Sequence, residues 1–167
     1  MAAAHARRSL AGALEGQSTK VKNPVASGSQ ELSGSCACGR VGYRAISGAS
    51  AIIHCHCSDC RKRHGSAFAT HVGVPREQFT VVQGRDAVEM YRTNSGTRRW
   101  FCKLCGSKLV SEADGWDEVY VTAGTLDGPI EIASQIHIFV RSKVSWYDIP
   151  SEHVQYFTHP VDWLEQR

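Results

Sequence analysis

Short runs in which apolar and polar residues alternate recur along most of the chain. Between Arg40 and Ile46, the residues Val41, Tyr43 and Ala45 share one side, and this period of two predicts a β-strand. Similar β-branched or aromatic runs predict further strands at Phe68–Val74, Phe79–Val82, Ala87–Tyr91, Arg98–Phe101 and Glu118–Ala123. Asn94-Ser95-Gly96 lies between two of these runs and predicts a hairpin.

Helical patterns are few and short. Ser58–His64 is the one segment before the C-terminal region that we expect to be helical, and Ser151–Tyr156 and Val161–Gln166 are predicted short terminal helices. Glycine and proline separate the strand-like runs, and no repeat or coiled-coil heptad is present in the sequence. The pattern therefore predicts a mainly β fold, a single domain of short strands with few short helices.

The first 33 residues differ from the rest of the chain. They are rich in Ala, Ser and Gly, and no aromatic residue precedes Tyr43. Because such a segment cannot bury enough apolar surface to offset its ordering entropy, we expect a flexible tail over 1–33, a domain over 34–160 and a short tail over 161–167. Met1–Leu14 carries two arginines and no acid, which faintly resembles a transit peptide, although a disordered extension is favoured.

Composition narrows the classes of protein. The chain has 167 residues, which is the size of one domain, and its 42% hydrophobic and 21% charged residues exclude wholesale disorder. A net charge of +3 is too mild to predict nucleic acid as a partner. No apolar run approaches the roughly 20 residues of a membrane span, so no membrane partner is expected.

The seven cysteines are the most informative residues. Their number is odd and we find no secretory signal, which argues against a disulfide framework and favours free thiols in a cytoplasmic protein. They form three groups: a C-x-C at Cys36 and Cys38, a C-x-C-x-x-C at Cys55, Cys57 and Cys60, and a C-x-x-C-G at Cys102 and Cys105. A C-x-x-C followed by glycine is typical of a zinc knuckle, in which two sulfurs converge on one metal ion.

Ligand counting divides the seven cysteines into four and three. A structural zinc site has four protein ligands, whereas a catalytic site has three and an open position. The two cysteine pairs supply a structural site of Cys36, Cys38, Cys102 and Cys105, and the trio supplies a site of three ligands. We therefore expect two zinc ions per chain.

Alternatives remain for several of these residues. An iron–sulfur cluster also uses four cysteines, but the ferredoxin spacings are missing from the sequence. His54, His56 and His64 are candidate fourth ligands, although a histidine beside a ligand more often supports the site from outside.

The basic run Arg61–Arg63 follows Cys60 and either offsets the sulfur charge or binds an anionic substrate. For Arg98-Arg99 a solvated surface is favoured. Trp100, Trp116, Trp146 and Phe139 are pocket candidates that are more often core residues.

Four segments resemble the glutathione-dependent formaldehyde-activating enzyme family, which includes centromere protein V. They are GSCACGRVGY at Gly34–Tyr43, HCHCSDCRKRHGSAF at His54–Phe68, RWFCKLCGSKL at Arg99–Leu109 and VYVTAGTLD at Val119–Asp127, with His137 and Trp146 further on. The resemblance implies a twisted, zinc-stabilised all-β fold shared with type-B methionine sulfoxide reductases. It also implies the same division into a structural and a catalytic zinc. His64 is a departure, since the family often has Ser or Thr there.

The resemblance implies an enzyme of the carbon–sulfur lyase class, which adds glutathione to formaldehyde and gives S-hydroxymethylglutathione. Zinc held by the trio at Cys55–Cys60 lowers the pKa of the substrate thiol, and the thiolate attacks the carbonyl carbon. Arg61 and Lys62 are then expected to hold the glutathione carboxylates, and His64 or His56 to transfer the proton. The alternatives are a non-catalytic zinc module that binds a macromolecule and an enzyme that uses another thiol or aldehyde.

Overall fold

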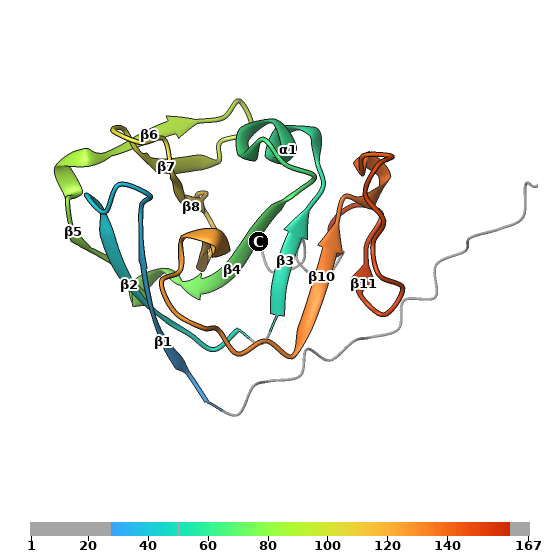
Figure 1. Ribbon diagram of the computed structural model, residues 1–167, viewed down its shortest axis with the longest axis horizontal. Coiled ribbons are helices and arrows are strands. Elements are labelled where there is room, and N and C mark those ends of the chain that lie inside the picture. Colours follow the sequence, from blue (N-terminus) through green and yellow to red (C-terminus); the bar gives the residue numbers. More distant parts are fainter. Residues whose placement is uncertain (1–27, 50, 161–167) are drawn as a thin grey trace, which may run out of the picture.

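The computed structural model describes residues 28–49 and 51–160, and these form two β-sheets and one α-helix (Figure 1). The strands are β1 Gln30–Ser35, β2 Gly42–Ser47, β3 Ala51–Cys55, β4 Ala69–Pro75, β5 Phe79–Gln83, β6 Val88–Arg92, β7 Arg98–Cys102, β8 Lys108–Glu112, β9 Glu118–Thr122, β10 Ser134–Ile138 and β11 Val154–Gln155. The helix α1 covers Ser58–His64, and four 3-10 turns lie at Arg76–Gln78, Arg85–Ala87, Ala123–Thr125 and Val140–Ser142. In the described ranges, no helix has the length and apolar character to cross a membrane.

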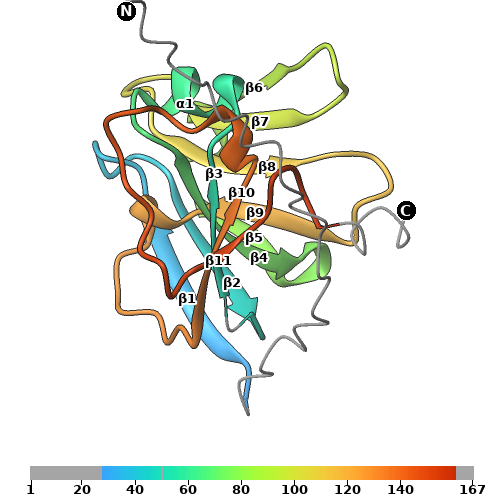
Figure 2. The same cartoon turned by 90° about the vertical axis from the view of Figure 1, so that its right-hand side faces the viewer.

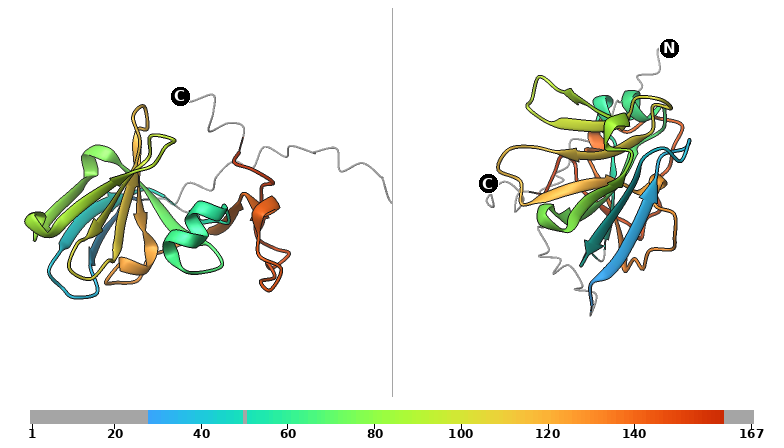
Figure 3. Two further views of the ribbon diagram at one scale, coloured as in Figure 1. Left: turned by 90° about the horizontal axis from the view of Figure 1, so that it is seen from above. Right: turned by 90° about the vertical axis from the view of Figure 1, so that its left-hand side faces the viewer.

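The smaller sheet has the order β1-β2-β5 and is antiparallel throughout. It faces the part of the larger sheet that contains β4, β9, β8 and β7 (Figures 1 and 3). The alternation predicted from the sequence determines which face of this sheet points inward, because Val41, Tyr43 and Ala45 are all buried. They pack against Val72 and Val121 of the larger sheet in one hydrophobic core.

The larger sheet has the order β11-β10-β3-β4-β9-β8-β7-β6. Most of its pairs are antiparallel, but β10 runs parallel to β3 and places His137 beside His54 and Ile138 beside Cys55. Figure 1 shows β3, β10 and β11 side by side in this order, and Figure 2 views the molecule from their side. A second hydrophobic core forms here around Ile53, Cys60 and Ile136. It holds the N-terminal end of α1 against the sheet.

The mainly β fold is confirmed, and α1 has the predicted bounds. The predicted strands are found within two residues at each end, and Asn94–Gly96 forms the turn between β6 and β7. Strands β1, β3, β8, β10 and β11 were not predicted; in β3 and β10 a buried histidine interrupts the apolar pattern.

Two sequence-based boundaries are wrong. β1 begins at Gln30, four residues before the expected start of the domain, because Leu32 is buried and the strand pairs with β2 along its whole length. Ser151–Tyr156 is a turn followed by β11 instead of a helix, since Val154 pairs with Ile136 of β10. The predicted tails over 1–27 and 161–167, and the helix at Val161–Gln166, lie outside the described residues.

Gly84 offers a test of the packing between β5 and the loop that carries Cys36 and Cys38. Its φ is +67°, and a Cβ there would overlap the carbonyl oxygen of Arg40. We expect Gly84→Ala to lower the free energy of unfolding by about 3–5 kcal/mol, from left-handed strain plus the overlap. The matched control is Gly115→Ala, where φ is +77° and nothing lies near a Cβ. Gly115→Ala should lower the free energy of unfolding only by the left-handed strain, about 1–2 kcal/mol. Urea unfolding measures both, and equal losses would contradict the packing argument.

Candidate metal centres

The four-cysteine cluster (Cys36, Cys38, Cys102 and Cys105) joins two loops that are far apart in the sequence. Cys36 and Cys38 follow β1, whereas Cys102 ends β7 and Cys105 lies in the turn before β8. Each loop closes on a glycine with positive φ, Gly39 at 72° and Gly106 at 77°. The backbone N–H of each glycine donates to the carbonyl of the first cysteine of its loop, at 2.8 Å in both cases. The two loops thus have the shape of paired knuckles.

The sulfur positions in this cluster fit a tetrahedral metal ion. Cys38 Sγ lies 3.4 Å from Cys36 Sγ and 3.9 Å from Cys102 Sγ. Four thiolates about 2.3 Å from a zinc ion would be about 3.8 Å apart. A backbone donor favours the thiolate form of Cys36, since the Val41 N–H donates to Cys36 Sγ at 3.2 Å. The side-chain hydrogen bond between Cys105 and Ser107 lowers the pKa of Cys105 to about 5. Since all seven cysteines are free thiols, this arrangement suits a metal ion better than a disulfide.

The three-cysteine cluster (Cys55, Cys57 and Cys60) forms where β3 passes into α1. Cys55 ends the strand, Cys57 is the N-cap residue, and its sulfur accepts the N–H of Cys60 at 3.3 Å. The local sequence therefore brings the three sulfurs together within one turn. Cys55 and Cys60 are buried, whereas Cys57 is partly exposed. Three thiolates around an accessible edge are the donor set of a metal site with one open position.

The histidines around this cluster bond to each other and to nearby polar groups. His54 has both ring nitrogens engaged, with Thr70 Oγ1 at 3.1 Å and Gln135 Oε1 at 2.9 Å. His56 Nε2 lies 2.8 Å from His137 Nδ1, and His137 Nε2 lies 3.1 Å from His153 Nδ1. Among the described residues, no histidine joins either group of converging ligand atoms. His54 and His56 are thus not ligand candidates but are hydrogen-bonded to residues of β10. Local sequence patterns do not reveal this contact, because it depends on the parallel pairing of β10 with β3.

His64 is the last residue of α1, the helix that carries Cys60. Its ring meets that of His71 edge to face, with centroids 5.6 Å apart. His71 is buried and its Nδ1 has no hydrogen-bond partner among the described residues. Burial lowers the pKa of His64, and it lowers that of His71 to about 3, so both rings are neutral at pH 7.

A cationic cavity of about 240 Å³ lies beside α1 and the three-cysteine cluster. Its lining contains three cations and no carboxylate; the residues are Arg63, His64, Tyr91, Arg99, Trp100, Phe101, Lys108, Val110 and Ser111. Arg99 connects this cavity to the cluster, because its Nη2 lies 3.8 Å from Cys60 Sγ. The Arg63 guanidinium stacks over the Tyr91 ring at 4.3 Å. Asp59 pairs with Arg63 at 3.0 Å and with Arg99 at 3.6 Å. Among the described residues Lys108 is the cation of this lining without an ion pair, and it favours an anionic ligand here.

Arg61 and Lys62 do not line this cavity. The Arg61 Nε donates to the His56 carbonyl at 3.2 Å, and Lys62 is exposed. Arg99 was interpreted from the sequence as a solvated residue, yet strand alternation places it toward Cys60 and its neighbour Arg98 toward Glu112. The signal in the sequence is the alternation of the predicted strand Arg98–Phe101, which places Arg98 and Arg99 on opposite faces.

A mainly β domain with one four-thiol and one three-thiol cluster defines a class of protein with two candidate metal sites. The sequence profile of the glutathione-dependent formaldehyde-activating enzymes matches residues 31–142, and this chain belongs to that family. A Halomonas elongata protein whose name places it among these enzymes is 30% identical over 129 residues, which are 72% of this chain and 82% of that protein. A Schizosaccharomyces pombe protein named as an uncharacterized lyase is 26% identical over 73% of this chain and 88% of its own length. A crystal structure of a Rhodobacter sphaeroides protein has a TM-score of 0.50 and 25% identity, and it covers 59% of this chain and 90% of that one.

The thiols of the three-cysteine cluster should differ in acidity once the metal is removed. Hydrogen bonds from Cys55 and then Cys60 lower the pKa of Cys57 to about 2, and the pKa of Cys55 is raised, chiefly by its bond to Cys57. A group with a lowered pKa stays a thiolate as the pH falls, so iodoacetamide at pH 6 should alkylate Cys57 before Cys55 and Cys60 in chelator-treated protein. Peptide mapping measures the order. Faster alkylation of Cys55 would contradict it.

Proposed function

We propose that this protein is a zinc-dependent enzyme of the carbon–sulfur lyase class, which adds the thiol of glutathione to formaldehyde or another small aldehyde. The observation that supports this most directly is the three-cysteine cluster, which has an accessible edge at Cys57 and opens beside a cationic cavity. Membership of the family supports the same chemistry. A reducing compartment such as the cytoplasm would keep the seven thiols free and is the location we propose.

In this proposal each group has a defined task. A zinc ion held by Cys55, Cys57 and Cys60 supplies the positive centre that stabilises a substrate thiolate. The cations of the cationic cavity bind the glutathione carboxylates and orient the thiol toward the cluster. His64 is neutral at pH 7, so a ring nitrogen can accept the thiol proton. The sulfur–carbon bond forms as the carbonyl π bond opens, and the proton passes from His64 to the new alkoxide oxygen.

The second zinc has a structural task in this proposal. The four-cysteine cluster holds Cys36 and Cys102, both buried, at the contact between the two sheets. Loss of its metal should therefore lower stability, whereas loss of the metal at the three-cysteine cluster should mainly remove activity.

Cys57→Ala tests this division. We expect the wild-type chain to contain two zinc ions and the variant one, with a melting temperature close to that of the wild type and glutathione adduct formation at least 100-fold slower. Cys36→Ala is the matched control, which should also lose one zinc but unfold at a markedly lower temperature. Elemental analysis, thermal unfolding and formaldehyde consumption give the three readouts. If Cys57→Ala loses a zinc and still forms the adduct at the wild-type rate, the proposal is wrong, and a non-catalytic zinc module becomes the better interpretation.

The residues that hold the carboxylates can be tested separately. The expectation from the sequence is Arg61 and Lys62, whereas the cationic cavity offers Arg63, Arg99 and Lys108. We propose the cavity residues and expect Lys108→Met to raise the KM for glutathione about tenfold, because a charge-assisted hydrogen bond is lost. Lys62→Met, which removes a nearby exposed charge, should leave this KM unchanged.

Lys108 contacts the Phe101 ring and forms no hydrogen bond to a cysteine among the described residues, so the metal content of the variant should not change. An uncharged thiol such as 2-mercaptoethanol gives the internal control, since its KM should be the same in both variants and the wild type. A larger effect from Lys62→Met would favour the assignment made from the sequence.

A further inference from the structure

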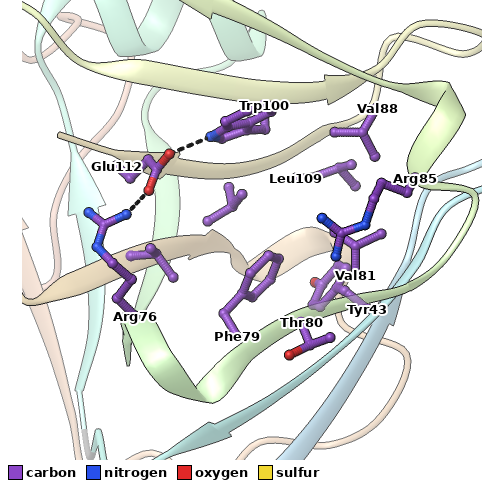
Figure 4. Close-up of a pocket in the computed structure, with 12 residues that line it drawn as sticks. Tyr43, Arg76, Phe79, Thr80, Val81, Arg85, Val88, Trp100, Leu109 and Glu112 are labelled. Atoms are coloured by element: carbon purple, nitrogen blue, oxygen red, sulfur yellow. Dashed lines mark hydrogen bonds and ion pairs between the residues drawn. The ribbon is translucent and has the colours of Figure 1, made fainter.

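A second cavity, of about 310 Å³, lies between the two sheets and is called the inner cavity here (Figure 4). Most of its walls are apolar, and half-buried Phe79, Val81, Val88 and Trp100 expose carbon surface to it. In Figure 4, Phe79 lies at the centre, Trp100 above it and Arg85 at one end. A cavity of this size and character is in the range of small-molecule sites.

The inner cavity is separate from the proposed active site. No cysteine is among the residues that line it, and among the described residues only Trp100 and Val110 also line the cationic cavity. These two residues belong to β7 and β8, so this pair of strands forms the wall between the two cavities. An occupant of the inner cavity therefore does not need the metal centres.

One end of the inner cavity is polar but already neutralised. Glu112 there forms ion pairs with Arg76 and Arg98, the latter at 3.0 Å, and accepts the Trp100 indole N–H at 2.9 Å. Arg76 also donates to two backbone carbonyls, those of Ala113 and Trp116. Since every one of these groups has a partner, this end offers no free charge to a ligand.

The other end carries an unneutralised cation, Arg85. It lines the cavity and is exposed, and within residues 28–49 and 51–160 it forms no ion pair. The adjacent carboxylate, Asp86, is paired instead with Arg40 at 2.8 Å. A guanidinium at the rim of an apolar cavity is a site for a carboxylate.

The size of the cavity limits the apolar part of the ligand. A dry cavity of about 150 Å³ accommodates benzene, so 310 Å³ leaves room for about two fused rings. Aromatic side chains line it, with the Tyr43 and Phe79 rings 5.3 Å apart. A strongly polar ligand would lose its hydration against these walls without new partners, and a cation would meet Arg85.

We propose that the inner cavity binds a small aromatic monocarboxylate, with its ring between Phe79 and Trp100 and its carboxylate at Arg85. Burial of the ring removes apolar surface from water, which favours binding. The ion pair at the rim selects the anion over a neutral analogue of the same shape. This site is independent of the proposed thiol chemistry.

The probes are 2-naphthoate and its neutral analogue 2-naphthalenemethanol, titrated by calorimetry into the full-length, zinc-loaded protein. A ligand of this size should bind the wild type with a Kd of about 0.1 mM, and the alcohol should bind several-fold more weakly. The Trp100 indole N–H resonance, assigned from Trp100→Phe, should shift with naphthoate. Absence of binding, or equal affinity for the two probes, would overturn the proposal.

Three variants locate the site. Arg85→Gln should weaken naphthoate about fivefold and leave the alcohol unchanged. Val81→Phe fills the cavity and should abolish binding of both probes. Val82→Phe, at the neighbouring exposed position that does not line the cavity, should bind both probes normally and controls for folding.

Cys57→Ala tests whether the site is independent of the three-cysteine cluster, and it should also bind naphthoate normally. Loss of binding in Cys57→Ala, or its survival in Val81→Phe, would show that the probe occupies another site and would overturn the assignment.

Discussion

The convergence of four thiols from two distant loops is the constraint on which the rest of the structure depends. Cys36 and Cys38 lie in the loop between β1 and β2 of the smaller sheet, and Cys102 and Cys105 lie where β7 of the larger sheet turns into β8, so their cluster joins the sheets at one end. Its like-charged sulfurs, 3.4 and 3.9 Å apart, are stable together only with a cation or with bound protons. A domain of short strands has a limited core, and a metal at this point would replace contacts that a larger core supplies.

The three-cysteine cluster depends on a different set of contacts. It is formed by adjacent residues of one segment, and β3 is held on both sides, by β4 and by the parallel β10. Cys55 and Cys60 also pack in the second hydrophobic core, against residues of β3 and β10. A metal ion here would therefore be less tightly coupled to folding than one at the four-cysteine cluster. A metal site that must also accept a substrate requires this weaker coupling between metal binding and folding.

The sequence predicted the features that local patterns encode. The division of the cysteines follows from ligand counting, and α1 and the alternation of Val41 and Tyr43 follow from periodicity. The parallel contact of β10 with β3 could not be predicted, because it joins residues about 80 positions apart and its buried positions include His54 and His137. Arg99 was missed for another reason: beside Arg98 it reads as part of a solvated basic pair. Strand alternation separates the two residues, but only the sheet shows which of them faces Cys60.

The alternation in β7 also explains how one small domain can contain two chemically different cavities. Arg99 and Phe101 face the cationic cavity, whereas Trp100 reaches the inner one and lies at the boundary of both. Its indole N–H is fixed to Glu112, and two arginines in turn fix that carboxylate. A ring anchored in this way resists displacement from either side, so the wall between the cavities is stiff. Coupling between two sites needs an element with two arrangements, so the two cavities should act independently. The charge of the cationic cavity then leaves the apolar character of the inner cavity intact.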